Sequence, residues 1–173
     1  MRSTRYRADR VERLEDDGNM YYMYVFADKS RDQFPYQFEA DINGRYVVEN
    51  EHENNRDLEA DYITTFFTLE REAFENGSVY LFGELTDWEI KEEFEMSYVK
   101  DENSYVLKTL LKQGYYNYVY AYVEDGKTKP DIGAIEGNWF ETENMYQILV
   151  YYRPFGARYD RLIGGTALNS LDW

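Results

Sequence analysis

Between residues 62 and 154 the chain alternates short runs of strand-forming residues with breaks that contain turn residues. The runs are rich in Tyr, Phe, Val and Leu, and aromatic and β-branched residues favour half-buried pleated surfaces. They predict six strands, at Tyr62–Leu69, Ser78–Phe82, Phe94–Val99, Ser104–Leu111, Tyr115–Glu124 and Met145–Arg153. No run of apolar residues at helical spacing is long enough to compete, so the pattern predicts an all-β fold.

Short strands separated by turns are typical of an immunoglobulin-like antiparallel β-sandwich. A smaller β-rich unit precedes it, with strand-like runs at Tyr21–Ala27, Tyr36–Ile42 and Arg45–Glu49. The stretch Glu49–Tyr62 is acidic, Asn-rich and nearly free of apolar residues, which indicates a linker or a long exposed loop. The predicted domains are therefore a smaller β-rich unit with its acidic linker at 1–60, the immunoglobulin-like sandwich at 61–160 and a tail at 161–173.

The alternation is cleanest in the run YYNYVYAYVED. Tyr116, Tyr118, Tyr120 and Tyr122 share one face of the predicted strand, and smaller residues such as Val119 share the other. Because the smaller residues suit a sandwich core, we expect the tyrosine row to line the outer face of a sheet. The row is then a packing surface, in the core or between domains, or a contact face for another protein, or a saccharide platform.

The segment after the last predicted strand does not have the composition of a linker. Pro154 cannot donate to a strand ladder, so we expect the strand to end near Arg153 and the chain to leave the sheet. Large apolar or aromatic residues such as Phe155 and Tyr159 nevertheless follow, together with Arg158 and Arg161. Two explanations stay open: the segment folds back on the chain and pairs with local carboxylates, or it docks on a partner with Arg and aromatic anchors.

Charge and hydropathy exclude several kinds of partner. The chain has 34 acidic and 19 basic residues and a net charge of -15, so we expect nucleic acid and anionic lipid to be repelled. No apolar run approaches ~20 residues, so no segment is predicted to span a bilayer. The first twenty residues contain no apolar signal-peptide core.

The sequence gives no support to catalysis, and we expect a protein that is not an enzyme. With no Cys and a single His, His52, we expect no zinc site and no thiol chemistry. The Asp41–Gly44 stretch begins like a calcium loop, but Arg45 stands at the fifth position and a plain turn is the better interpretation. Neighbouring carboxylates are expected by chance among so many acids, so they identify no glycosidase pair. No cofactor, metal or small-molecule ligand is predicted.

Two segments together resemble the β-sandwich domains that bind glycogen or starch: GELTDW (Gly83–Trp88) and GYYNYVYAYVEDG (Gly114–Gly126). Trp88 matches the first sugar-stacking tryptophan of those domains. The chain departs from them at Val119, where they place a binding lysine, and after Asp125-Gly126, where no second tryptophan follows. The resemblance therefore implies the fold, while glycan binding through Trp88 and the Tyr116–Tyr122 face is an alternative function.

Longer stretches resemble a more specific family, the plug protein of the Bacteroidetes type IX secretion system, in its C-terminal half. The stretches that carry the resemblance are Arg2–Glu12, Phe38–Glu51, Glu59–Tyr62, Val79–Trp88, Leu110–Tyr120 and Ile135–Gly164. The last, IEGNWFETENMYQILVYYRPFGARYDRLIG, is the longest and most distinctive of them.

This resemblance implies a non-enzymatic protein of the periplasm, associated with the outer membrane, whose partner is the outer-membrane translocon protein. It also implies that residues 1–60 complete a preceding sandwich. A protein-interaction module is thus the first hypothesis, a carbohydrate-binding module the second and a glycan-acting enzyme the third. The predicted partner-binding residues are Trp88, Tyr116, Tyr118, Tyr120, Tyr122, Phe155, Arg158, Tyr159 and Arg161.

Overall fold

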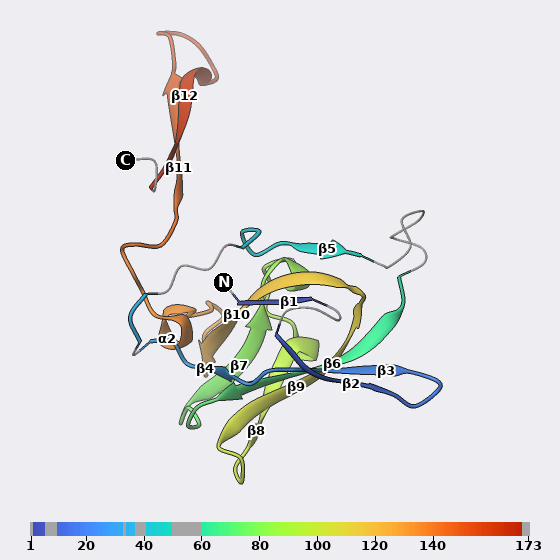
Figure 1. Ribbon diagram of the computed structural model, residues 1–173. Helices are drawn as coiled ribbons and strands as arrows, with labels where there is room; N and C mark the ends of the chain where they lie inside the picture. The colour runs from blue at the N-terminus through green and yellow to red at the C-terminus, as the bar shows by residue number, and fades with distance from the viewer. Residues whose placement is uncertain (1, 6–9, 33, 37–40, 50–59, 171–173) are drawn as a thin grey trace. The chain divides into compact units, whose positions relative to one another are not determined.

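The computed structural model describes residues 2–5, 10–32, 34–36, 41–49 and 60–170. It divides into two compact units, Met1–Asn138 and Trp139–Trp173. The first unit contains one large sheet, and the second contains a two-stranded hairpin (Figure 1). Both predicted domain boundaries, at 60 and at 160, therefore lie inside a unit.

The first unit is a curled sheet of ten strands with very little helix. Its strands are β1 (Arg2–Arg5), β2 (Val11–Asp16), β3 (Tyr21–Val25), β4 (Asp28–Lys29), β5 (Tyr46–Val48), β6 (Tyr62–Glu70), β7 (Gly77–Phe82), β8 (Glu95–Val99), β9 (Ser104–Lys112) and β10 (Gly114–Glu124). Two 3₁₀ turns, Glu84–Thr86 and Glu92–Phe94, and the single-turn helix α2 (Gly133–Glu136) complete it.

Strand order in the sheet is β1-β10-β7-β8-β9-β6-β3-β2, with β4 also paired to β6 and β5 to β10. Strand β8 pairs with β7 through Met96 and with β9 through Ser97 to Val99, so it carries the sheet from one layer into the other. The predicted all-β, sandwich-like fold is confirmed. From β6 to β10, each strand end lies within one residue of its predicted position.

The strands described before residue 60 belong to the same sheet as the strands after it. Strand β3 pairs in parallel with β6, from Tyr21 opposite Ile63 to Tyr24 opposite Phe66. Strands β1 and β5 both pair with β10. A change in composition marks a loop in this chain, whereas a domain boundary requires that few backbone pairings cross it. The predicted linker lies largely in residues 50–59, and the predicted strand Tyr36–Ile42 largely in residues 37–40; both ranges are outside the described residues.

The core lies between the two layers. Strand β6 turns Ile63, Thr65, Phe67 and Leu69 inward, and these residues are at most 1% exposed. Strand β10 is buried on both faces, because Tyr118 and Tyr120 join the main core while Val119 and Ala121 join a second cluster with Phe82. Side-chain size therefore does not identify the core face of this strand, and the expectation that the tyrosine row lies on an outer face is wrong.

The tail expected at 161–173 contains a regular strand. The second unit is an antiparallel hairpin of β11 (Met145–Tyr152) and β12 (Arg161–Asn169). Strand β11 ends one residue before its predicted end, ahead of Pro154. The chain then reverses, with Gly156 at a φ of 85° and the Ala157 N–H donating to the Pro154 carbonyl over 3.0 Å. Left-handed backbone is inexpensive at glycine, so this turn returns the chain as β12.

Candidate functional site

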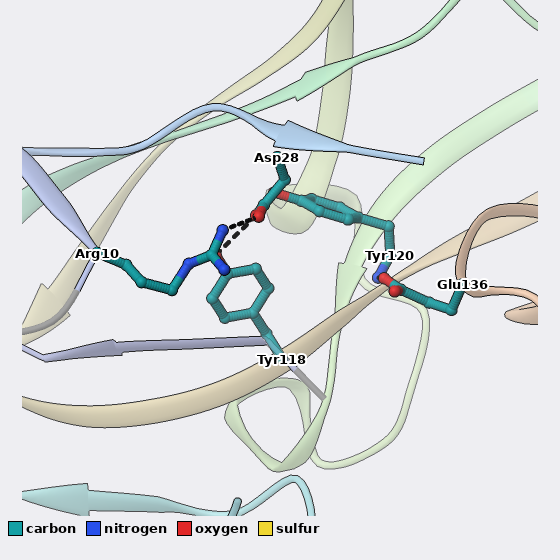
Figure 2. Close-up of polar contacts among 5 residues, drawn as sticks. All are labelled: Arg10, Asp28, Tyr118, Tyr120 and Glu136. Atoms are coloured by element: carbon teal, nitrogen blue, oxygen red, sulfur yellow. Dashed lines mark hydrogen bonds and ion pairs between the residues drawn. The ribbon is translucent and has the colours of Figure 1, made fainter. Parts of the chain in front are cut away.

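The tyrosines of β10 meet a buried carboxylate. Asp28 is 1% exposed, and its Oδ2 accepts hydrogen bonds from the hydroxyls of Tyr118 and Tyr120, each over 2.9 Å. Arg10 forms an ion pair with Oδ1 of the same carboxylate. Figure 2 shows the three side chains converging on Asp28. Tyr118 and Tyr120 are completely buried, so neither presents a ring to a partner or a sugar.

The outer two tyrosines of the predicted row are also engaged within the chain. Burial raises the pKa of Tyr116 to about 12, and its hydroxyl donates to the Lys112 carbonyl over 2.8 Å. Tyr122 donates to the carbonyl of Asn76 and stacks on Phe74 with ring centroids 4.0 Å apart. The predicted row therefore acts as a packing surface, one of the interpretations that the sequence left open.

Trp88 is the half-exposed member of the predicted site, with 43% of its surface accessible. It follows the 3₁₀ turn Glu84–Thr86, and its N–H donates to the Gly83 carbonyl over 3.0 Å. Asp87 and Trp88 both have left-handed backbone, with φ values of 56° and 59°. Its ring packs edge-on against Phe82 at 5.6 Å. None of the four tyrosines of the predicted row presents a ring beside it, so the row gives Trp88 no second plane for stacking a sugar.

The outer face of the β2-β3-β6-β9 layer holds aromatic residues that the sequence analysis did not single out. Tyr24 and Phe66 stack with centroids 4.5 Å apart and planes 6° apart. Arg13 lies 4.0 Å from the Tyr24 centroid and Lys108 lies 5.7 Å from that of Phe66. The period-two alternation of β6 was visible in the sequence, but the parallel partner β3 that brings Tyr24 beside Phe66 was not. Because the rings stack on each other, this face is a stabilising ladder rather than an open platform.

The second unit holds more than half of the exposed large hydrophobic side chains among the described residues, most of them on the hairpin. Most of its large side chains are at least 42% exposed, on both faces of the ribbon. These side chains are Met145, Tyr146, Ile148, Leu149, Val150, Tyr151, Tyr152, Leu162, Ile163 and Leu168. Opposite residues of an antiparallel pair share a face. One face therefore carries Tyr146 with Leu168, and the other carries Tyr151 with Leu162.

The turn of the hairpin gathers the remaining predicted residues. Phe155 is fully exposed and Tyr159 is 61% exposed. Arg153 donates two hydrogen bonds of 2.8 Å to the two oxygens of Asp160. The Arg161 guanidinium lies 5.5 Å from the Tyr159 ring, and Arg158 is exposed. The Arg153–Asp160 pair is a contact of the kind that the fold-back explanation expects, whereas Phe155, Arg158 and Tyr159 are exposed within their own unit, so both explanations stay open.

The described part of the chain contains neither a metal-binding cluster nor a helix suited to cross a membrane. Among those residues, no group of three or more His, Cys, Asp or Glu side chains is placed to hold a metal ion. None of the helices among them is long and apolar enough to cross a membrane. His52 lies outside the described residues.

Comparisons with known proteins identify a similar structure. A protein from Parabacteroides merdae ATCC 43184, described only as hypothetical, has a crystal structure at 2.30 Å resolution that is similar to this chain with a TM-score of 0.83 and 40% sequence identity. The match covers 97% of this chain and 44% of the other, so this chain spans less than half the length of its relative. No family model and no curated protein matches the sequence.

The burial of the Asp28 carboxylate leads to a prediction about the stability of the fold. We expect Asp28→Asn to lower the free energy of unfolding by about 3 kcal/mol, because the substitution leaves the partly buried Arg10 without its counter-charge. Urea denaturation measures the change. Asp125→Asn, at the exposed turn after β10, is the matched control and should keep the wild-type midpoint. Equal midpoints for wild type and Asp28→Asn would show that the carboxylate does not stabilise the fold.

The burial of the tyrosine row also predicts weak or absent glucan binding. Calorimetry with maltoheptaose should give no dissociation constant tighter than about 100 µM, which is roughly -5.5 kcal/mol. The reason is that Trp88 alone offers one aromatic plane. Trp88→Ala should then give the same small heats as the wild-type chain. Tighter binding that disappears in Trp88→Ala would restore the carbohydrate hypothesis.

Proposed function

We propose that this chain is a non-enzymatic protein-interaction module of a bacterial secretion system, of the kind that closes the periplasmic side of the type IX outer-membrane translocon. The observation that carries the proposal is the hairpin of β11 and β12, which exposes apolar side chains on both faces. Patches of this kind mark contact surfaces in soluble proteins. The partner is the translocon protein, and the site of action is the periplasm at the outer membrane.

The energetics of a two-stranded ribbon support a docking role. An isolated hairpin is marginally stable in water, because each face has too little to bury against. Placing one of these aromatic or aliphatic side chains in a partner's pocket contributes about 1.5–3 kcal/mol for full burial. A partner that covers even one face of the hairpin therefore stabilises both the complex and the hairpin itself.

The turn supplies the anchors of the contact. Phe155, Arg158 and Tyr159 are exposed together, and aromatic residues and arginine are the types enriched in interface hot spots. Asp160 compensates Arg153, whereas Arg158 and Arg161 add positive charge to a chain of net charge -15. This local reversal of charge favours a partner surface with carboxylates near its apolar groove.

The sequence resemblance to the plug family includes this same hairpin. Its longest matching stretch, Ile135–Gly164, starts in α2, contains all of β11 and the turn, and continues into β12. The matching stretches Val79–Trp88 and Leu110–Tyr120 lie in β7 with its following turn and at the β9–β10 connection. The elements that support the proposal from structure are thus among those that support it from sequence.

A triple substitution at the turn tests the proposal. We expect Phe155→Ala/Arg158→Ala/Tyr159→Ala to abolish co-purification of the full chain with translocon complexes from the outer membrane of its own bacterium. The melting temperature should stay within about 1 °C of wild type, since surface substitutions usually change stability by less than 0.5 kcal/mol. Affinity capture of the tagged chain and thermal unfolding give the two measurements.

The matched control is Lys127→Ala/Thr128→Ala/Lys129→Ala, at the exposed segment after β10. It should keep both the melting temperature and the association. A turn variant that still co-purifies would remove the turn from the contact. A turn variant that loses stability would show that the segment packs against its own chain, as the fold-back explanation requires.

A further inference from the structure

One edge of strand β11 is unprotected. Among the described residues it pairs only with β12, so the backbone groups of its other edge have no strand partner. Its eight residues, MYQILVYY, include no charged residue, no proline and no glycine. Natural proteins protect such edges with lysines, prolines, bulges or a covering element, because a long, flat, apolar edge readily accepts another strand.

We propose that β11 pairs edge to edge with β11 of a second copy of this chain. The two strands run antiparallel about a two-fold axis at Ile148, and the two hairpins join into one four-stranded sheet. This inference goes beyond the docking function, because it uses the edge of the hairpin rather than its turn. Symmetric pairing of identical surfaces is the commonest form of self-association among soluble proteins.

Charge at the ends of β11 favours this arrangement. Glu141 and Glu143 precede the strand and Arg153 follows it. With the axis at Ile148, Glu143 of each copy lies opposite Arg153 of the other, and Arg153 can bind this second carboxylate in addition to Asp160 of its own turn. A parallel arrangement would place Glu143 beside Glu143 and Arg153 beside Arg153, which is unfavourable.

The distribution of charge over the whole chain points to the same place. The stretch 139–173 has three arginines and four carboxylates, so nearly all of the net charge of -15 belongs to the first unit. Two copies that approach through their first units therefore repel each other. The hairpin is close to neutral, and strand β11 has no charge to oppose an identical strand.

The other free edge of the hairpin, on β12, is poorly suited to pair with a further strand. The register of the pair shifts between Val150 and Tyr151, where Ile163 of β12 is the extra residue. Gly164 and Gly165 follow directly, and Arg161 begins the strand. A bulge twists an edge away from regular pairing and glycine weakens a strand, so pairing stops at two copies instead of continuing into a fibre.

A lipid surface cannot form hydrogen bonds with the backbone groups on the free edge of β11. Backbone N–H and C=O groups without partners cost several kcal/mol each in hydrocarbon, and a lipid offers them no hydrogen bonds. A second β11 provides both the backbone partners and an apolar side-chain row on each face of the ladder.

The absence of cysteine from the chain permits a clean crosslinking test. In the full 173-residue chain, Ile148→Cys places one thiol on the axis, where opposite Cβ atoms lie about 4.5–5.5 Å apart, close to what a disulfide requires. We expect oxidised glutathione to convert this variant largely to a covalent dimer. Thr166→Cys is the matched control, since Thr166 lies opposite Ile148 on the same face but on β12. Its thiols would be roughly 14 Å apart in the four-stranded sheet and should remain free.

Light scattering and sedimentation of the cysteine-free chain supply the second measurement. We expect a concentration-dependent dimer, weakened roughly tenfold by Glu143→Arg, because two symmetric attractions then become repulsions. A chain that stays monomeric at several hundred micromolar overturns the inference, as does equal crosslinking of the two cysteine variants. The turn variant Phe155→Ala/Arg158→Ala/Tyr159→Ala should dimerise normally, so loss of translocon association and loss of the dimer are separate outcomes.

Discussion

The buried carboxylate of Asp28 is the interaction on which the arrangement of the first unit depends. Moving a carboxylate out of water costs several kcal/mol unless charged and hydrogen-bonding partners compensate it. Here Arg10 and the hydroxyls of Tyr118 and Tyr120 provide that compensation. The partners come from the segment before β2 and from β10, so one polar centre joins three segments that are far apart in the sequence (Figure 2). Glu136 extends the same region, accepting the Tyr120 N–H over 3.0 Å.

This centre decides which surfaces remain for function. Because the tyrosines of β10 are needed inside, the aromatic excess of that strand contributes to packing and polar compensation rather than to recognition. Trp88 is held by Phe82 and by its turn. More than half of the exposed large hydrophobic side chains among the described residues belong to the second unit, and its hairpin has no buried core of its own. The same residue type, tyrosine, thus serves opposite purposes in the two units, according to whether a second layer covers it.

Much of the fold was predictable because local signals determine it. Alternation and turn residues located β6 to β10 to within one residue, and Pro154 located the end of β11. The non-local pairings were not predictable: the parallel contact of β3 with β6 leaves no mark in either strand's own sequence. The face of the tyrosine row was missed for a related reason. Its alternation is real, but which face is core depends on Asp28, located some ninety residues earlier in the chain. At the hairpin, the exposed Phe155, Arg158 and Tyr159 were predictable from composition, whereas β12 was hidden by Gly164-Gly165.

The hairpin also shows how exposure and stability are linked. In a large sheet, neighbouring strands provide hydrogen bonds to the backbone on both edges of a strand, and a second layer covers its side chains. Each strand is therefore stabilised both by backbone pairing and by side-chain packing. In the hairpin, β11 and β12 satisfy only one edge of each other, and their own unit contains no second layer among its described residues to cover either face. Its free energy of folding by itself is therefore small. Any strand that pairs with β11, or any surface that covers a face, raises the stability of the hairpin by its own binding energy. Recognition and local folding are then one equilibrium, and the unpaired edge and uncovered faces are the features that couple them.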